Sequence, residues 1–157
     1  MDSKVKLSTF SLILTIIITG VLIVGTAILY NEGNNKWGIA AAILLILLIF
    51  GLLYGPTSIS VADKNVTVKT FLKRIKLPIS KIESVELFQP TMGAIKIFGS
   101  GGFMGHWGFF KEGDIGQYTA FYGKSSDCFL VKMKNGDKYV LGCENPSQMV
   151  NYIKSQM

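Results

Sequence analysis

The residues with the most chemical potential lie in one glycine- and aromatic-rich stretch, residues 98–116 (FGSGGFMGHWGFFKEGDIG). Closely spaced glycines are typical of loops that bind phosphate, but a dinucleotide-binding loop needs G-x-G-x-x-G between a strand and a helix. In GSGGFMG the last glycine comes one residue late, no helix-forming run follows, and the Gly-Lys-Ser/Thr of a Walker A loop is absent. The stretch therefore does not predict a phosphate-binding loop.

The aromatic residues of this stretch have two interpretations. Rings that cover bare glycine backbone would fill the core of a tight, irregular strand pair, which is the usual place for aromatic side chains. On this interpretation the buried residues are Phe98, Phe103, Trp107 and Phe109. The alternative hypothesis is that some rings face outwards at a lipid surface, where Trp and Phe are favourable. The contact residues would then be Phe103, Trp107 and Phe110.

Other reactive side chains are few. His106 is the single histidine and has no Cys-x-x-Cys motif or carboxylate pair nearby, whereas a metal site needs three or four converging donors. We expect it to hydrogen-bond within its loop. No set of acid, base and nucleophile can be named. The sequence therefore predicts no catalytic residue, no metal site and no cofactor, and the protein is expected not to be an enzyme.

The two cysteines, Cys128 and Cys143, lie symmetrically about the Asn135-Gly136 pair. A disulfide between them is geometrically conceivable if the two flanking strands pair directly. The cytoplasmic location inferred below keeps thiols reduced, so we expect free, buried cysteines.

A group of basic residues forms the second candidate site. These residues are Lys64, Lys69, Lys73, Arg74 and Lys76. Beyond residue 55 the chain has 13 Lys and Arg against 8 Asp and Glu, a moderate excess that suits a domain beside an anionic lipid leaflet. It lacks the dense basic stripe of nucleic-acid-binding proteins. We therefore expect contacts with membrane lipids or a protein partner, and no nucleic acid.

Two apolar blocks precede these residues and must position them. Residues 7–30 form a block of 24 residues and residues 37–55 a block of 19, and neither block contains a charge. About 20 apolar residues in a helix cross the ~30 Å hydrocarbon core of a bilayer. A cleaved signal peptide is the alternative for the first block, but the block is too long and lacks a small-x-small cleavage site. The sequence predicts a transmembrane helical hairpin with 31–36 as a short external loop.

The distribution of lysine orients this hairpin. Lys4 and Lys6 precede the first block and the basic group follows the second, whereas the connecting loop has only Lys36, offset by Glu32. Basic residues near transmembrane ends stay on the cytoplasmic side. We therefore expect a multi-pass protein with residues 1–6 and 56–157 in the cytoplasm. The absence of charge inside the spans argues against a transporter or proton path.

Small and hydroxyl-bearing residues recur along both spans. Ser11, Thr15 and Thr19 are spaced four apart in the first span, and Gly51 and Gly55 form a small-xxx-small pair in the second. Such faces allow helices to pack closely. They fit pairing within the hairpin and self-association between copies equally well.

Residues 56–157 have the pattern of antiparallel strands followed by one helix. The expected strands are 58–63 and 66–71 around a DKN turn, 73–77, the second half of 79–87, 117–123, 129–133 and 138–141. Around Asn135-Gly136 we favour a bulged three-residue loop over a two-residue loop, because it aligns Phe129 with Leu141 on one face. A helix capped by Asn145 should bury Met149, Val150 and Ile153.

The order of two spans, several strands and a final helix resembles the bacterial pleckstrin-homology (PH)-like domain proteins. The residues that carry the resemblance are Leu77–Ile82 (LPISKI), Gly105–Phe110 (GHWGFF) and Gly136–Ile153 (GDKYVLGCENPSQMVNYI). It implies a mainly antiparallel PH-like curved sheet or partly open barrel with a C-terminal capping helix. In the better-known PH family, basic residues around the first hairpin hold phosphoinositide headgroups. The basic group here lacks the K-x(n)-K-x-R pattern, so that specificity is not carried over.

Together these features predict a non-enzymatic protein of the bacterial inner membrane. Its cytoplasmic PH-like domain would be a binding or scaffold module for a protein partner, for another copy of the chain as a homo-oligomer, or for anionic lipid headgroups. The alternative is a small accessory or regulatory subunit whose transmembrane helices carry the binding.

Overall fold

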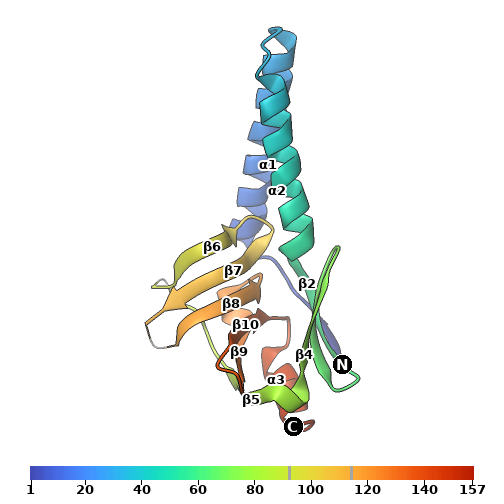
Figure 1. Ribbon diagram of the computed structural model, residues 1–157, viewed down its shortest axis with the longest axis vertical. Helices are drawn as coiled ribbons and strands as arrows, with labels where there is room; N and C mark the ends of the chain where they lie inside the picture. The colour runs from blue at the N-terminus through green and yellow to red at the C-terminus, as the bar shows by residue number, and fades with distance from the viewer. Residues whose placement is uncertain (92, 114) are drawn as a thin grey trace.

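A long helical hairpin stands on a β-rich domain in the computed structural model, which describes residues 1–91, 93–113 and 115–157 (Figure 1). The hairpin consists of α1 (Thr9–Asn31) and α2 (Trp37–Tyr54). Both helices are long and apolar enough to cross a membrane. The 18 residues of α2 give a length of about 27 Å, close to the thickness of a hydrocarbon core.

Two sheets make up the domain. The first has the order β1-β2-β3-β4, and all of its neighbours are antiparallel. Its strands are β1 (Asp2–Lys4), β2 (Pro56–Ala62), β3 (Asn65–Thr70) and β4 (Arg74–Pro78). A short 3₁₀ turn, Ile79–Lys81, leads from β4 into the second sheet.

The second sheet has six strands in the order β5-β9-β10-β8-β7-β6. These are β5 (Ile82–Leu87), β6 (Ile95–Gly102), β7 (Gly105–Glu112), β8 (Gly116–Tyr122), β9 (Cys128–Met133) and β10 (Lys138–Gly142). Its pairs are antiparallel except β10 with β8, which run parallel. Neither sheet closes on itself, and α3 (Pro146–Lys154) follows the last strand. The predicted fold class, an apolar helical hairpin before a partly open PH-like β domain with a C-terminal helix, is confirmed.

The main core lies between the two sheets and α3. Alternate residues of β2 and β3 point inwards, so Ile59, Val66 and Val68 are fully buried. As the helical pattern predicts, α3 buries Met149, Val150 and Ile153 on the same cluster. A second cluster covers the opposite face of the six-stranded sheet and contains Phe110, Tyr118, Ala120, Tyr122, Cys128, Leu130 and Val140.

The turn chemistry predicted around Asn135-Gly136 is confirmed. Met133 N donates to Asp137 O, and Phe129 pairs with Leu141, as the bulged loop requires. In this register Cys128 pairs with Gly142, so it is offset by one residue from Cys143. Both cysteines are free and buried, as expected.

The first strand was not predicted. Within residues 1–6, expected only as a cytoplasmic N-terminus, Asp2–Lys4 form β1 at the edge of the first sheet, and Ser3 is buried there. The amino group of Met1 donates to Val61 O at 2.9 Å, and Val61 N donates back to Met1 O. Because β1 and β2 are adjacent strands of one sheet, the helical hairpin is an insertion between two strands of the domain.

Candidate functional site

The glycine-rich stretch forms the joint between the helices and the domain. It folds into β6, β7 and their connecting turn, in which Met104 N donates to Thr15 Oγ1 at 2.9 Å. A side chain on Gly51 of α2 would overlap Met104 Sδ, and one on Gly55 would crowd the Met104 backbone. Thr15, Gly51 and Gly55 are therefore used within the chain, to admit this turn.

Trp107 and Phe110 are both buried, on opposite faces of β7. Trp107 is 7% exposed, and its ring stacks on Tyr54 of α2 with centroids 5.5 Å apart. Its Nε1 donates to Phe103 O at 3.1 Å, and Phe103 itself is half-buried beside the helices. Phe110 is 3% exposed and lies in the second cluster next to Tyr118. The Phe110 ring is therefore closed off from the surroundings, and the Trp107 ring exposes only a small part of its surface.

The expectation that Phe98 and Phe109 are core residues was wrong. They pair with each other across β6 and β7, and their exposed fractions are 60% and 46%. Phe109 lies on the same face of β7 as Trp107, but Tyr54, which covers the Trp107 ring, does not reach the neighbouring Phe98–Phe109 pair. Ile95 and Ile97 of the same edge strand are also exposed.

An exposed apolar tip lies between β3 and β4. Phe71 and Leu72 are 62% and 65% exposed. Thr70 Oγ1 donates to Leu53 O at 2.8 Å, and Leu72 N donates to Leu52 O at 3.2 Å. The tip is therefore level with the last turn of α2. Phe71 was expected to end a strand and the tip was not predicted, although two adjacent large apolar residues before Lys-Arg were a usable signal.

Three of the five predicted basic residues lie close to this tip. Lys73 directly follows it, with Nζ 5.6 Å from the centroid of the Tyr54 ring. Lys69 and Arg74 pair across β3 and β4, and Lys69 also pairs with Ser58 of β2. Ser58 lies two residues beyond the first residue of β2, and strands rise about 3.3 Å per residue. Lys69 and Arg74 are therefore about 7 Å from Pro56, the first residue of β2.

The other two basic residues are further from the helices. Strands β2 and β4 run away from the hairpin (Figure 1). Lys76 pairs with Thr67, which pairs with Ser60, the fifth residue of β2, so it lies about 13 Å from Pro56, the first residue of β2. Lys64 occupies the turn that follows Ala62, the last residue of β2, so it lies about 20 Å from Pro56. The structure thus does not bring the five basic residues into one cluster.

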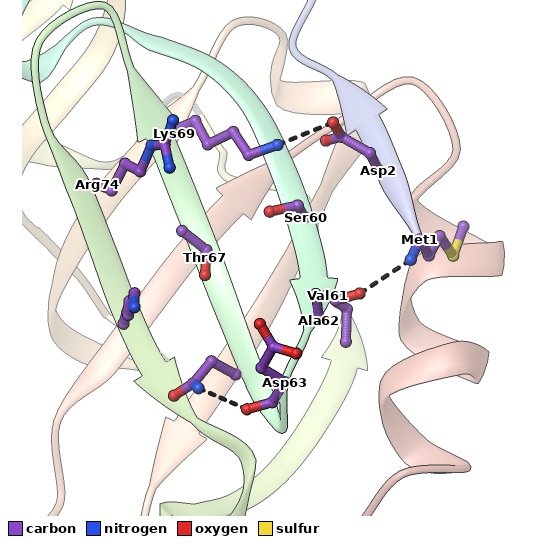
Figure 2. A pocket seen from close by; sticks show the side chains of 11 residues that line it. Met1, Asp2, Ser60, Val61, Ala62, Asp63, Thr67, Lys69 and Arg74 are labelled. Carbon is purple, nitrogen blue, oxygen red and sulfur yellow. Dashed lines mark hydrogen bonds and ion pairs between the residues drawn. The ribbon is translucent and has the colours of Figure 1, made fainter.

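The outer face of the first sheet is hollowed, and Figure 2 shows this surface. The hollow measures about 400 Å³. It is lined by Met1, Asp2, Ser60, Val61, Ala62, Asp63, Asn65, Thr67, Lys69, Arg74 and Lys76. Lys69 and Arg74 lie at one end and Asp63 at the other (Figure 2). The sign of the charge therefore changes along the hollow, with the positive end towards the helices.

One ion pair crosses the positive end. Lys69 Nζ lies 2.9 Å from Asp2 Oδ2, and this hydrogen bond holds the pKa of the Asp2 carboxyl below its usual value. Arg74 and Lys76 make no ion pair among the described residues. Arg74 and Lys76 therefore remain free to meet an external anion.

The remaining reactive residues are scattered, with His106 half-buried and both cysteines buried. His106 stacks on Tyr122 with centroids 4.6 Å apart, and its Nδ1 has no hydrogen-bond partner within the described residues, contrary to the predicted loop hydrogen bond. Burial lowers the pKa of His106 and raises the pKa of the Cys128 thiol. Across residues 1–91, 93–113 and 115–157, no three His, Cys, Asp or Glu side chains converge as metal ligands would.

An open two-sheet domain with a C-terminal helix and a partly basic first hairpin defines a small PH-type binding domain, here carried on an apolar helical hairpin. Residues 57–157 match the sequence profile of the family described as Bacterial PH domain. The chain belongs to this family. The matched region starts in β2, so it leaves out β1 and both long helices. No match was found among curated proteins or among solved structures.

Proposed function

We propose that this protein is a non-enzymatic, membrane-anchored PH domain that docks on anionic lipid headgroups of the inner leaflet of the bacterial cytoplasmic membrane. The observation that carries the proposal is the β3–β4 tip. Its exposed Phe71 and Leu72 lie level with the last turn of α2, and Lys73 and Arg74 follow them directly. Apolar residues backed by cations are the combination that binds an anionic lipid surface.

The pairing of β1 with β2 supports the orientation. Strands of one sheet lie on one side of a membrane, so the N-terminus and the domain share a compartment, and α1 and α2 cross the bilayer as a hairpin. The lysines of this compartment then follow the positive-inside rule. Tyr54 at one end of α2 and Trp37 at the other lie where interfacial aromatic residues are expected.

Distance from the start of β2 divides the basic residues into two groups. The headgroup layer adds about 5–7 Å on each side of the hydrocarbon core. Lys73, at the tip, and Lys69 and Arg74, about 7 Å from Pro56, fit within or at the edge of this layer, whereas Lys76, at about 13 Å, lies beyond it. Lys64 is about 20 Å away, well beyond the ~8 Å over which surface charge acts at physiological ionic strength. Lys73 and Arg74 are therefore the proposed lipid contacts, because Lys69 already pairs with Asp2 and Lys64 is too far away.

Binding through the transmembrane helices has less support. Part of the small-residue surface of the helices is already used within the chain, since Thr15 accepts a hydrogen bond from Met104 and Gly51 packs on the same residue. Membrane insertion explains the exposed apolar surface of the spans. It does not explain the exposed charged and apolar surface of the domain.

The test uses the full-length protein and a matched pair of variants. Native mass spectrometry would count phosphatidylglycerol and phosphatidylethanolamine retained by the wild type, by Lys73→Ala/Arg74→Ala and by Lys64→Ala. We expect the preference for the anionic lipid to fall about 30-fold in the double variant, because each cation contributes ~1 kcal/mol. The preference should be unchanged in Lys64→Ala. Equal preference in the wild type and the double variant would overturn the proposal.

A further inference from the structure

A second, apolar crevice lies where β6 and the β6–β7 turn meet both long helices. Its volume is about 250 Å³, below the 300–1,000 Å³ typical of sites for soluble small molecules. Most of its walls are apolar side chains, namely Leu14, Ile18, Leu47, Phe50, Phe103 and Trp107. A crevice of this size and lining suits part of a hydrocarbon chain better than a polar metabolite.

The position of the crevice decides what can reach it. Phe50 and Leu47 lie four and seven residues before the end of α2, which places them about 6 and 10 Å above that end. If α2 crosses the membrane as proposed, this depth is the outer part of the hydrocarbon core. Lipid chains are the abundant solute there, and Leu47 itself is partly open to them, at 37% exposed.

One cation lies at the rim of this apolar crevice. Lys96 of β6 is exposed, lines the crevice and makes no ion pair within the described part of the chain. Its Cδ passes the bare backbone of Gly101, 3.8 Å from where a side chain there would begin. Lysine commonly lays its methylene groups along apolar surface while its ammonium group reaches the headgroup layer. The unpaired ammonium group of Lys96 therefore complements the phosphate at the headgroup end of an inserted acyl chain.

We propose that this crevice binds one phospholipid of the inner leaflet, with an acyl chain against α1, α2 and Trp107 and its phosphate at Lys96. The proposal rests on the membrane insertion in the proposed function but uses none of the residues of the β3–β4 tip. A lipid bound here would pack against the turn that joins the helices to the domain. It would therefore fix the domain relative to the bilayer from the side opposite the tip.

Two pairs of variants test the site in the full-length protein. Leu47→Trp narrows the crevice, and the partly exposed position of Leu47 on α2 leaves room for the larger side chain. Leu45→Trp is its control, because Leu45 lies on the same helix, is 59% exposed and does not line the crevice. Lys96→Gln removes the charge. Lys111→Gln removes an exposed lysine of the neighbouring strand that does not line the crevice.

The readout is the amount of phospholipid that remains after extensive delipidation, measured by native mass spectrometry. We expect one tightly held phospholipid in the wild type and both controls, its loss in Leu47→Trp, and about fivefold lower occupancy in Lys96→Gln. Lys73→Ala/Arg74→Ala should retain this lipid, which separates the site from the tip. A wild type without retained lipid, or Leu47→Trp and Lys96→Gln both with wild-type occupancy, would overturn the proposal.

Discussion

Replacing the apolar tip with serine, in Phe71→Ser/Leu72→Ser, should release the β3–β4 turn from the bilayer. The two residues are 62% and 65% exposed in the protein alone, so a lipid surface can bury about two thirds of each. Full burial of a large apolar side chain contributes about 1.5–3 kcal/mol. The double substitution therefore removes roughly 2–4 kcal/mol of docking free energy, which corresponds to about 30-fold or more in the docking equilibrium.

Hydrogen exchange of the full-length protein in lipid nanodiscs measures this release. The amide of residue 72 donates to Leu52 O, and we expect docking of the tip on the bilayer to limit the opening of this bond. Its exchange, normalised for the side-chain change, should therefore accelerate by about 30-fold or more in the variant. Leu87→Ser is the matched control, because Leu87 is 55% exposed but lies on β5, at the end of the domain away from the helices (Figure 1). A wild-type exchange rate at residue 72 in the double variant would contradict docking of the tip through Phe71 and Leu72.

Three further predictions concern buried or paired residues. Trp107→Ala should lower the free energy of unfolding by about 3–5 kcal/mol, as measured by thermal denaturation in detergent; unchanged stability would show that the ring is not core. The pKa of Asp2 is depressed by its lysine partner, so its small stabilisation is present above the unfolded pKa of ~3.9 and is lost as pH falls through the lower folded pKa; Asp2→Asn should flatten that part of the stability–pH curve, and an unchanged curve would contradict the pair. Burial raises the pKa values of Cys128 and Cys143, so both thiols should resist maleimide at pH 7.5 and react on unfolding; labelling of the folded protein would contradict their burial.

The parts of the fold that were predicted correctly depend on local signals. The Asn135-Gly136 turn and the alternation on either side of it determine the β9–β10 register, because a one-residue slip would turn every side chain to the other face. The stripe of α3, with Met149 and Ile153 one turn apart, needs no information from elsewhere in the chain. The apolar length of α1 and α2 was equally readable from sequence alone.

The parts that were missed depend on contacts between distant segments. Strand β1 has three residues and no periodic pattern, and its partner β2 is more than fifty residues away. The exposure of Phe98 and Phe109 depends on where the cover from α2 ends, which no local pattern specifies. The role of Gly51 became visible only when the β6–β7 turn was seen against it.

In the proposed arrangement the β3–β4 tip enters the hydrocarbon edge of the membrane while the β2–β3 turn stays in water. Nitroxide labels on Leu72→Cys and, separately, on Lys64→Cys in nanodiscs test it directly, because the two native thiols are buried. The account predicts that the label at residue 72 is accessible to oxygen and shielded from a water-soluble relaxation agent, and that the label at residue 64 behaves in the opposite way. Equal exposure of both labels to the water-soluble agent would contradict it.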